Sequence, residues 1–268
     1  MPWALLIADW RSKREGKMRD NKLFIIVPCY NEADCLPRTA PVFLEKLKSL
    51  IEKGAADAES RVLFVDDGSA DDTWGIISRL HEESPLYAGL KIKPNGGHQK
   101  AVMAGIMEAY DRADVSISID VDLQDDINAM DKMMAAYLDG ASIVCGVRQS
   151  RATDSFLKRF TARAYYSLMN LFGAKLVFDH ADYRLMDKEA MRRLCLYHDD
   201  KLFLRGMITR LGLPLETVGY DRSERVAGES KYTVKKMLKL AKDGFACGKL
   251  KPKEERRPYD PHLAEKLF

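Results

Sequence analysis

The sequence predicts an α/β protein in which helices flank a mostly parallel, doubly wound sheet. Apolar runs of strand length alternate with segments of helical periodicity from Lys22 to Val147. Such alternation is typical of parallel sheets with right-handed crossovers. Acidic or small polar residues directly follow several of these runs, and ligands of open α/β sheets bind at the carboxyl ends of strands.

Five apolar runs are expected to form the strands, and helical spacing of apolar residues predicts the connections between them. The expected strands are residues 22–28, 61–65, 89–93, 115–119 and 141–147. The expected helices are residues 36–51, 72–83, 99–109 and 127–138. The first strand is apolar throughout, which indicates burial on both faces of the sheet.

Composition limits the class of protein. A chain of 268 residues that is 46% hydrophobic buries a substantial core. The net charge of +3 gives no indication of a nucleic-acid partner, so none is expected. Five scattered cysteines without a C-x-x-C pair indicate reduced thiols in a cytosolic compartment. No uncharged apolar stretch approaches the ~20 residues of a membrane span, so no transmembrane helix is expected.

The segment Val115–Asp126 carries the strongest chemical pattern. Its first five residues predict a strand, and Asp120, Asp122 and Gln124 follow it at two-residue steps. If the chain stays extended there, the three oxygen-bearing side chains point to one side. Carboxylate and amide oxygens suit Mg²⁺ or Mn²⁺. The alternative is an acidic loop that caps the helix starting near Asp126.

Two basic amphipathic helices are expected at 153–172 and 231–243. Each carries apolar residues on one side and lysines or arginines on the other, as helices on anionic lipid do. The alternative is a core-facing stripe with a solvated basic back. The predicted organisation is an N-terminal extension (1–20), one domain (21–245) that includes both helices, and a loosely held charged tail (246–268).

Seven short motifs occur in an order that resembles the polyprenyl-phosphate glycosyltransferases. This branch of the inverting GT-A glycosyltransferases includes dolichol-phosphate mannose synthase and bacterial undecaprenyl-phosphate glucosyltransferases. The motifs are VPCYNE (27–32), VDDGSADDT (65–73), NGGHQKAVMAG (95–105), DVDLQDD (120–126), GVRQSR (146–151), DYRLM (182–186) and RVAGESKY (225–232). The resemblance implies a GT-A (Rossmann-like) fold, a nucleotide-sugar donor, a divalent metal and a polyprenyl-phosphate acceptor.

The resemblance, together with the position of these residues after predicted strands, implies a donor site. Asp66 and Asp67 are expected to contact the nucleotide, whereas Ser69 and Asp71 are expected to cap the following helix. Lys100 follows two glycines and is expected near the diphosphate. The expected nucleotide-sugar contacts are Pro28, Tyr30, Glu32, Asp66, Asp67, Lys100, Asp120, Val121 and Asp122. For the first three, a turn with a helix cap is the alternative.

The resemblance also implies a binding site for the acceptor phosphate, formed mainly by arginines, because guanidinium groups suit phosphate oxygens. The expected phosphate contacts are Arg148, Arg151, Arg159, Arg163, Arg225, Ser230 and Lys231. Arg159, Arg163 and Lys231 have a solvated helix charge as an alternative. The expected catalytic residues are Asp120, Asp122, Asp182, Arg148 and Arg225. His98, His180 and His198 are interpreted as structural or surface residues.

Asp182 leaves two mechanisms open. A phosphate acceptor is already an anion, so Asp182 would orient a sugar hydroxyl or an arginine. A saccharide hydroxyl needs a base, and Asp182 would then supply it. The favoured reaction is inverting transfer of a hexose from UDP-glucose to undecaprenyl phosphate. A nucleotide-binding regulator without catalysis is a third hypothesis.

The segment after the second basic helix departs from the family, because many bacterial relatives carry two membrane spans there. The expected location is therefore peripheral, on the cytoplasmic face of the plasma membrane, with an anionic membrane surface as a partner. The sequence leaves open a separate membrane partner and a homo-oligomer.

Overall fold

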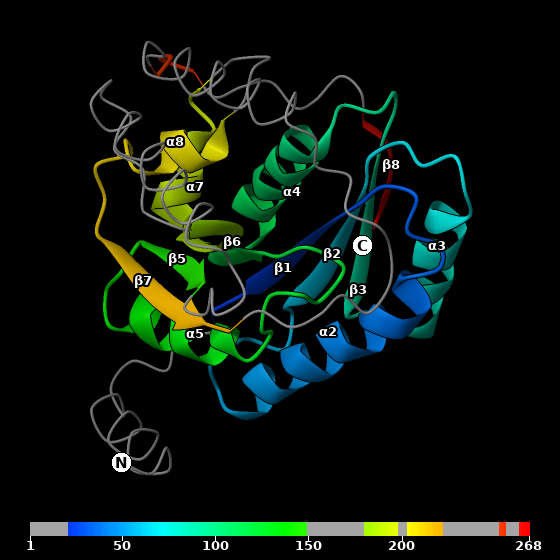
Figure 1. The fold of residues 1–268 in the computed structure, drawn as a ribbon, viewed down its shortest axis with the longest axis horizontal. Coiled ribbons are helices and arrows are strands. Elements are labelled where there is room, and N and C mark those ends of the chain that lie inside the picture. Colours follow the sequence, from blue (N-terminus) through cyan, green and yellow to red (C-terminus); the bar gives the residue numbers. More distant parts are fainter. Residues whose placement is uncertain (1–20, 149–179, 198–202, 222–251, 256–262) are drawn as a thin grey trace, which may run out of the picture.

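The computed structural model describes residues 21–148, 180–197, 203–221, 252–255 and 263–268. They form one eight-stranded sheet with the order β7-β5-β6-β4-β1-β2-β3-β8. Helices cover both faces of the sheet (Figure 1). The expected mostly parallel α/β architecture is confirmed.

All five expected strands are present. They are β1 (Leu23–Cys29), β2 (Arg61–Asp66), β3 (Tyr87–Ile92), β4 (Val115–Ser118) and β5 (Ile143–Arg148). The first four pair in parallel in the order β3-β2-β1-β4. Every residue of β1 is buried, as its continuous apolar character indicates.

Beside β4 the sheet is no longer parallel. β6 (His180–Asp187) lies between β4 and β5 and pairs antiparallel with both. β7 (Leu215–Tyr220) then pairs in parallel with β5. β6 carries charged side chains in the middle of the sheet, which is why its sequence does not have the apolar pattern of a buried strand.

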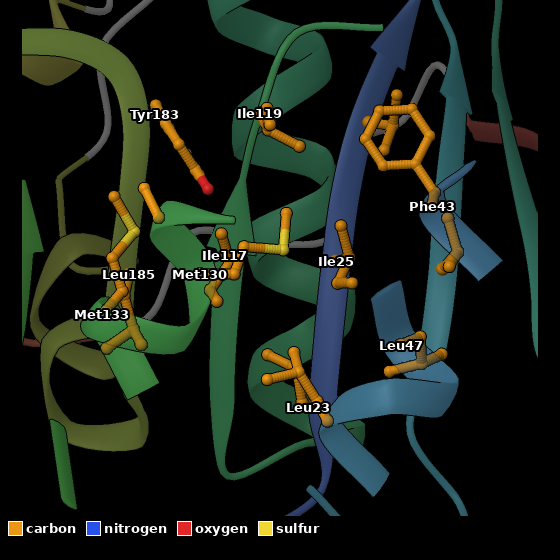
Figure 2. Packing of buried hydrophobic residues seen from close by; sticks show 14 of the residues in the cluster. Leu23, Ile25, Phe43, Leu47, Ile117, Ile119, Met130, Met133, Tyr183 and Leu185 are labelled. Carbon is orange, nitrogen blue, oxygen red and sulfur yellow. The ribbon is translucent and has the colours of Figure 1, made fainter. Parts of the chain in front are cut away.

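Two helical layers enclose the sheet. One comprises α2 (Leu36–Glu52), α3 (Thr73–Glu83) and α5 (Ala129–Leu138). The other comprises α4 (His98–Arg112), α7 (Lys188–Leu194) and α8 (Leu204–Ile208). Figure 2 shows part of the first layer, in which side chains of α2 and α5 pack on β1, β4 and β6. The labelled residues are Leu23, Ile25, Phe43, Leu47, Ile117, Ile119, Met130, Met133, Tyr183 and Leu185. Each is at most 1% exposed.

The last residues of the chain complete the sheet. β8 (Leu263–Leu267) pairs antiparallel with β3, so the expectation of a loosely held tail is wrong for this segment. Lys266 Nζ lies 2.7 Å from Glu108 Oε2, and Trp74 Nε1 donates to Glu265 Oε2 at 2.6 Å. These contacts tie β8 to α4 and α3 on opposite faces of the sheet.

The topology separates the loops that follow β1 and β4. The chain leaves β1 and β2 through α2 and α3 on one face, whereas the connection from β3 to β4 runs through α4 on the other. The loops therefore separate at the carboxyl ends of β1 and β4, where open α/β sheets bind ligands.

Several predictions lie outside the described residues. These are the basic helices 153–172 and 231–243, the N-terminal extension 1–20 and most of the tail 246–268. Within the described ranges, no helix has the length and apolar character that crossing a membrane requires. The four cysteines in those ranges, Cys29, Cys35, Cys145 and Cys195, are buried free thiols.

Candidate active site

The loops after β1 and β2 are joined side by side at the carboxyl edge of the sheet. Asn31 adopts a left-handed conformation (φ 54°); its N–H donates to Ser69 Oγ at 2.9 Å, and its Oδ1 accepts from Ala70 N at 2.8 Å. Asp71 accepts from the backbone N–H groups of Ala33 and Thr73. The N-cap of α3 is Asp72, whose side chain makes no cap bond; Asp71 contacts the helix start through the Thr73 N–H, while Ser69 joins the two loops.

The first three expected nucleotide contacts occupy different environments in this edge. Pro28 lies inside β1 and is buried, so the strand continues one residue past its expected end. Tyr30 is 43% exposed, which leaves its ring accessible to a ligand. The Glu32 N–H donates to Thr73 Oγ1 at 2.9 Å, and the Glu32 carbonyl accepts from Leu36 N at the start of α2.

Asp66 and Asp67 end β2 in two different ways. Asp66 is fully buried, and its Oδ1 accepts from Ser69 N at 3.1 Å. Its Oδ2 accepts no hydrogen bond within the described part of the chain. A buried carboxylate oxygen without a donor is costly, and a ligand N–H or hydroxyl would satisfy it.

Asp67 instead holds the loop that precedes α4. Its Oδ1 accepts from Gly96 N at 2.8 Å, and its Oδ2 accepts from Gly97 N at 2.8 Å and Asn95 Nδ2 at 3.1 Å. Burial raises the pKa of Asp67, although the two glycine N–H groups lower it. This structural role was not predicted from the sequence.

The glycines before α4 allow the loop its close turn. Gly97 has φ +87°, a left-handed conformation that favours glycine. The aliphatic chain of Lys100 lies over Gly96, where an added Cβ would approach Lys100 Cδ to 2.9 Å. The loop therefore sets the start of α4, and with it the positions of His98 and Lys100.

The loop after β4 turns instead of staying extended. A turn follows Asp120 at residues 121 and 122, and Leu123 has φ 51°. The assumption of an extended chain through Gln124 is therefore wrong, and Gln124 N donates to Asp122 Oδ1 at 3.2 Å. Val121 is buried beneath the turn at 5% exposure.

Asp120 lies in a group of acidic side chains at the carboxyl end of β4. Partial removal from water raises the pKa of Asp120, and the carboxylates of Asp182, Asp125 and Asp122 raise it further, whereas His98 lowers it. Within the described ranges, no three His, Cys, Asp or Glu residues form a preformed metal cluster. The assignment of Asp120, Asp122 and Gln124 as metal ligands stays a prediction.

Asp182 is enclosed by cations. It lies in β6 with only 10% of its side chain exposed and is ion-paired with Arg184 Nη2. Arg205 Nε donates to Asp182 Oδ1 at 3.2 Å, and Arg205 Nη2 donates to Oδ2 at 3.0 Å. Despite burial, these two arginines and His98 hold the pKa of Asp182 well below its usual range. Asp182 is therefore an anion at neutral pH.

His98 links the two carboxylates. Its Nε2 lies 3.7 Å from Asp120 Oδ1 and 3.7 Å from Asp182 Oδ2. His98 is exposed, as the interpretation of a surface residue expects, but the start of α4 also places its ring beside both carboxylates, which the sequence did not predict. Arg205 was also missed. Neither residue stands beside a strand end in sequence, and only the packing of α4 and α8 brings them to β6.

Arg148 is the last residue of β5 and contacts the loop that follows β4. Its Nη2 donates to Asp125 Oδ1 at 3.3 Å, and 30% of its side chain is exposed. Its Nε is buried without a hydrogen-bond partner in the described ranges. The remaining expected acceptor contacts, Arg151, Arg159, Arg163, Arg225, Ser230 and Lys231, lie outside the described residues.

Residues 24–195 match the family model described as Glycosyl transferase family 2. The chain belongs to glycosyl transferase family 2. It is therefore a glycosyltransferase, and the fold expected from its motifs agrees with this family.

Several bacterial and phage proteins resemble this family 2 chain over most of its length. The uncharacterized glycosyltransferase YkoT of Bacillus subtilis is 45% identical over 230 residues, which cover 86% of this chain and 68% of the relative. A bactoprenol glucosyl transferase of Shigella phage SfX is 34% identical over 225 residues, covering 84% and 71%.

A solved structure has the same fold. Glucosyl-3-phosphoglycerate synthase from Mycobacterium tuberculosis, solved with Mn²⁺, UDP and glucosyl-3-phosphoglycerate, superposes with a TM-score of 0.59. The two are 14% identical, and the alignment covers 90% of this chain and 82% of that one.

Proposed function

We propose that the chain transfers a hexose, with inversion, from a UDP-sugar to a polyprenyl phosphate, with UDP-glucose and undecaprenyl phosphate as the substrates. The relatives named bactoprenol glucosyl transferase support this acceptor and this sugar. The seven motifs of the sequence support the same reaction.

The observation that carries the proposal is the state of Asp182. Arg184 and Arg205 neutralise its carboxylate, and its pKa lies well below the usual range. A carboxylate held in this way is a poor general base at neutral pH. An acceptor hydroxyl needs a base, whereas an acceptor phosphate is already an anion. The phosphate acceptor therefore fits the site better than a saccharide hydroxyl with Asp182 as base.

The donor fits the edge formed by the loops after β1 and β2. The exposed ring of Tyr30 offers a surface for the base, and Asp66 Oδ2, which accepts no hydrogen bond from the residues that the structure describes, offers an acceptor for an N–H. The N-terminus of α4 and Lys100 favour the negative charge of a diphosphate. These groups orient the donor so that its anomeric carbon faces the acceptor side.

The residues fit a divalent cation, with Mg²⁺ and Mn²⁺ as the candidates. Asp120, Asp122, Asp125 and Asp182 act on one another, since burial first and then the other three carboxylates raise the pKa of Asp120, and an oxygen-rich group of this kind suits a hard cation. We assign Asp120, Asp122 and Gln124 as the ligands. When bound, the cation neutralises the leaving diphosphate.

The proposal includes peripheral binding to the cytoplasmic face of the membrane through residues 153–172 and 231–243. The helical spacing of their apolar residues, with basic residues between them, supports this placement. Sedimentation with liposomes that contain anionic lipid tests it. The chain is expected to pellet at low salt and to be released by high salt, and failure to pellet at low salt would contradict this placement.

The experiment for the reaction compares acceptors under one set of conditions. The purified chain is incubated with UDP-glucose, and with other UDP-sugars as alternatives, plus either undecaprenyl phosphate or a panel of saccharides. Transfer to the lipid phosphate, lost with a chelator and restored by Mg²⁺ or Mn²⁺, is expected. Transfer to saccharides alone would overturn the proposal, and UDP binding without transfer would favour a regulator.

A further inference from the structure

Asp125 is a buried carboxylate of the candidate site to which no role has been assigned. It lies in the loop after β4, directly after Gln124, and is 3% exposed. A carboxylate is costly to bury unless a charged group pairs with it. Arg148 Nη2, at the end of β5, donates to Asp125 Oδ1 at 3.3 Å. A guanidinium group from another strand is therefore the charged partner of this carboxylate.

The same contact orients the side chain of Arg148. Its Nε is buried without a hydrogen-bond partner in the described ranges, so the bond from Nη2 to Asp125 is what ties the guanidinium group to the loop. At the same time, 30% of the Arg148 side chain is exposed. The protein therefore holds one end of the guanidinium group while part of the side chain stays accessible.

The neighbouring strand packs along Arg148. β5 and β7 pair in parallel with Arg148 opposite Tyr220, which puts the two side chains next to each other on one face of the sheet. The ring of Tyr220 lies over Gly146, where an added Cβ would approach Tyr220 Cε1 to 2.8 Å. It also meets the ring of Tyr183 edge-on, with 5.4 Å between the centroids. These buried rings restrict the rotamers that Arg148 can adopt.

The loop that carries Asp125 is itself fixed to the rest of the fold. Tyr183 Oη donates to the carbonyl of Asp126 at 3.2 Å, and Cys35 Sγ, at the start of α2, lies 3.8 Å from the carbonyl of Val121. Both contacts are made to backbone oxygens, one on each side of Asp125 in the chain. A carboxylate on a loop held in this way can keep its partner in one place.

We propose that Asp125 is the positioning residue for Arg148 in acceptor binding. The carboxylate holds one end of the guanidinium group, so that its accessible part already faces the acceptor phosphate before the acceptor arrives. Asp125 contacts neither substrate and transfers no proton. This inference rests on the proposed function, in which Arg148 binds the acceptor phosphate. It links that arginine to the loop of the assigned metal ligands.

The test compares the two substrates in Asp125→Asn. The KM for undecaprenyl phosphate is expected to rise by roughly 5- to 10-fold, because the amide keeps a hydrogen bond to Arg148 but loses the charge. The KM for UDP-glucose should stay within about threefold, since Arg148 is assigned to the acceptor.

Glu108→Gln is the matched control for the loss of a buried, arginine-paired carboxylate. Glu108 is 2% exposed and lies 2.6 Å from Arg112 Nε, about 15 Å along α4 from His98. It should lose stability in urea unfolding and keep both KM values. A rise in the acceptor KM of Glu108→Gln equal to that of Asp125→Asn would show that lost stability alone explains the effect, and would count against the positioning role.

A double-mutant cycle tests whether Asp125 acts through Arg148. Arg148→Ala removes the group that Asp125 is proposed to hold, so adding Asp125→Asn should lower kcat/KM for the acceptor by less than about twofold more. Additive effects would contradict the positioning role. If Asp125→Asn does not fold, Asp125→Glu decides, because the longer side chain keeps the charge but displaces the guanidinium group. An unchanged acceptor KM in folded Asp125→Glu would then refute the inference.

Other roles of Asp125 give different results. If Asp125 held a cation, excess Mg²⁺ would restore Asp125→Asn, and the donor KM would rise together with the acceptor KM; either result would overturn the inference. If the unmodified chain transfers sugar to undecaprenyl phosphate and Asp125→Asn keeps its acceptor KM, only the inference is wrong. If the unmodified chain transfers nothing to the lipid phosphate, the proposed function itself fails.

Discussion

Replacing Asp67 by asparagine is expected to destabilise the loop before α4 by about 1.5–2 kcal/mol. The Asp67 carboxylate accepts from Gly96 N and Gly97 N at 2.8 Å each, and from Asn95 Nδ2 at 3.1 Å. An asparagine keeps one acceptor oxygen and places its NH₂ group against one of these donors. At least one bond to a charged group is lost, which is worth about 1.5–3 kcal/mol. Burial raises the pKa of Asp67, so the ionised carboxylate already bears a desolvation cost, and the lower end of that range applies.

Urea unfolding of the two proteins measures this difference in the free energy of unfolding. Asp72→Asn is a suitable control, because Asp72 is 63% exposed and pairs with the exposed Arg79. A surface pair of this kind is worth about 0–1 kcal/mol. Amide hydrogen exchange at residues 96 and 97 should also become faster in Asp67→Asn. Equal stability of Asp67→Asn and the unmodified chain, with unchanged exchange at both glycines, would refute the assignment of Asp67 to this loop.

Two further predictions concern packing and acid stability. Gly105→Ala in α4 is expected to lower the free energy of unfolding by about 1–3 kcal/mol, because its Cβ would clash with the buried Ile26 and lie 3.2 Å from Val65 Cγ2. Gly75→Ala in α3 is the control: the three atoms nearest to its added Cβ all belong to the exposed, flexible side chain of Asp72, which can move aside, so thermal unfolding should show no loss. The lowered pKa of Asp182 means that its ionised form stabilises the fold above pH about 4, and that this stabilisation is lost as the pH falls toward its folded pKa. Urea unfolding between pH 6 and pH 2 should therefore show a weaker acid dependence in Asp182→Asn, and an identical dependence would contradict the ion pairs.

The strands that sequence could predict are those with a local apolar or alternating pattern. Residues 23–29 and 62–65 form uninterrupted apolar runs, residues 115–118 alternate apolar residues with serine, and local patterns of this kind are enough to identify a buried strand. β6 has no such run, because Asp182 and Arg184 lie within it. These charges are tolerated in a central strand only because they pair with one another and with Arg205, and that partnership depends on a helix more than 20 residues away in the chain.

In the candidate site, the residues that directly follow a strand were predictable from the sequence, and the others were not. Asp66, Asp67 and Asp120 follow strands directly, so their positions at the sheet edge follow from the strand assignment. The direction of side chains beyond a strand end is set by turn geometry, and Leu123 with φ 51° breaks the two-residue alternation on which the metal site was predicted. His98 and Arg205 reach the site through helix packing, which no local pattern encodes.

The central claim is that guanidinium groups bind an acceptor that is already anionic, so that no general base is needed. Its most direct test is the rate of transfer from UDP-glucose to undecaprenyl phosphate in Arg148→Ala and Asp182→Asn across pH 6 to 9. We predict that Arg148→Ala loses most of its turnover at subsaturating acceptor, while Asp182→Asn keeps measurable turnover with the pH dependence of the unmodified chain. Loss of all turnover in Asp182→Asn, with Arg148→Ala unaffected, would contradict the claim and identify Asp182 as a base.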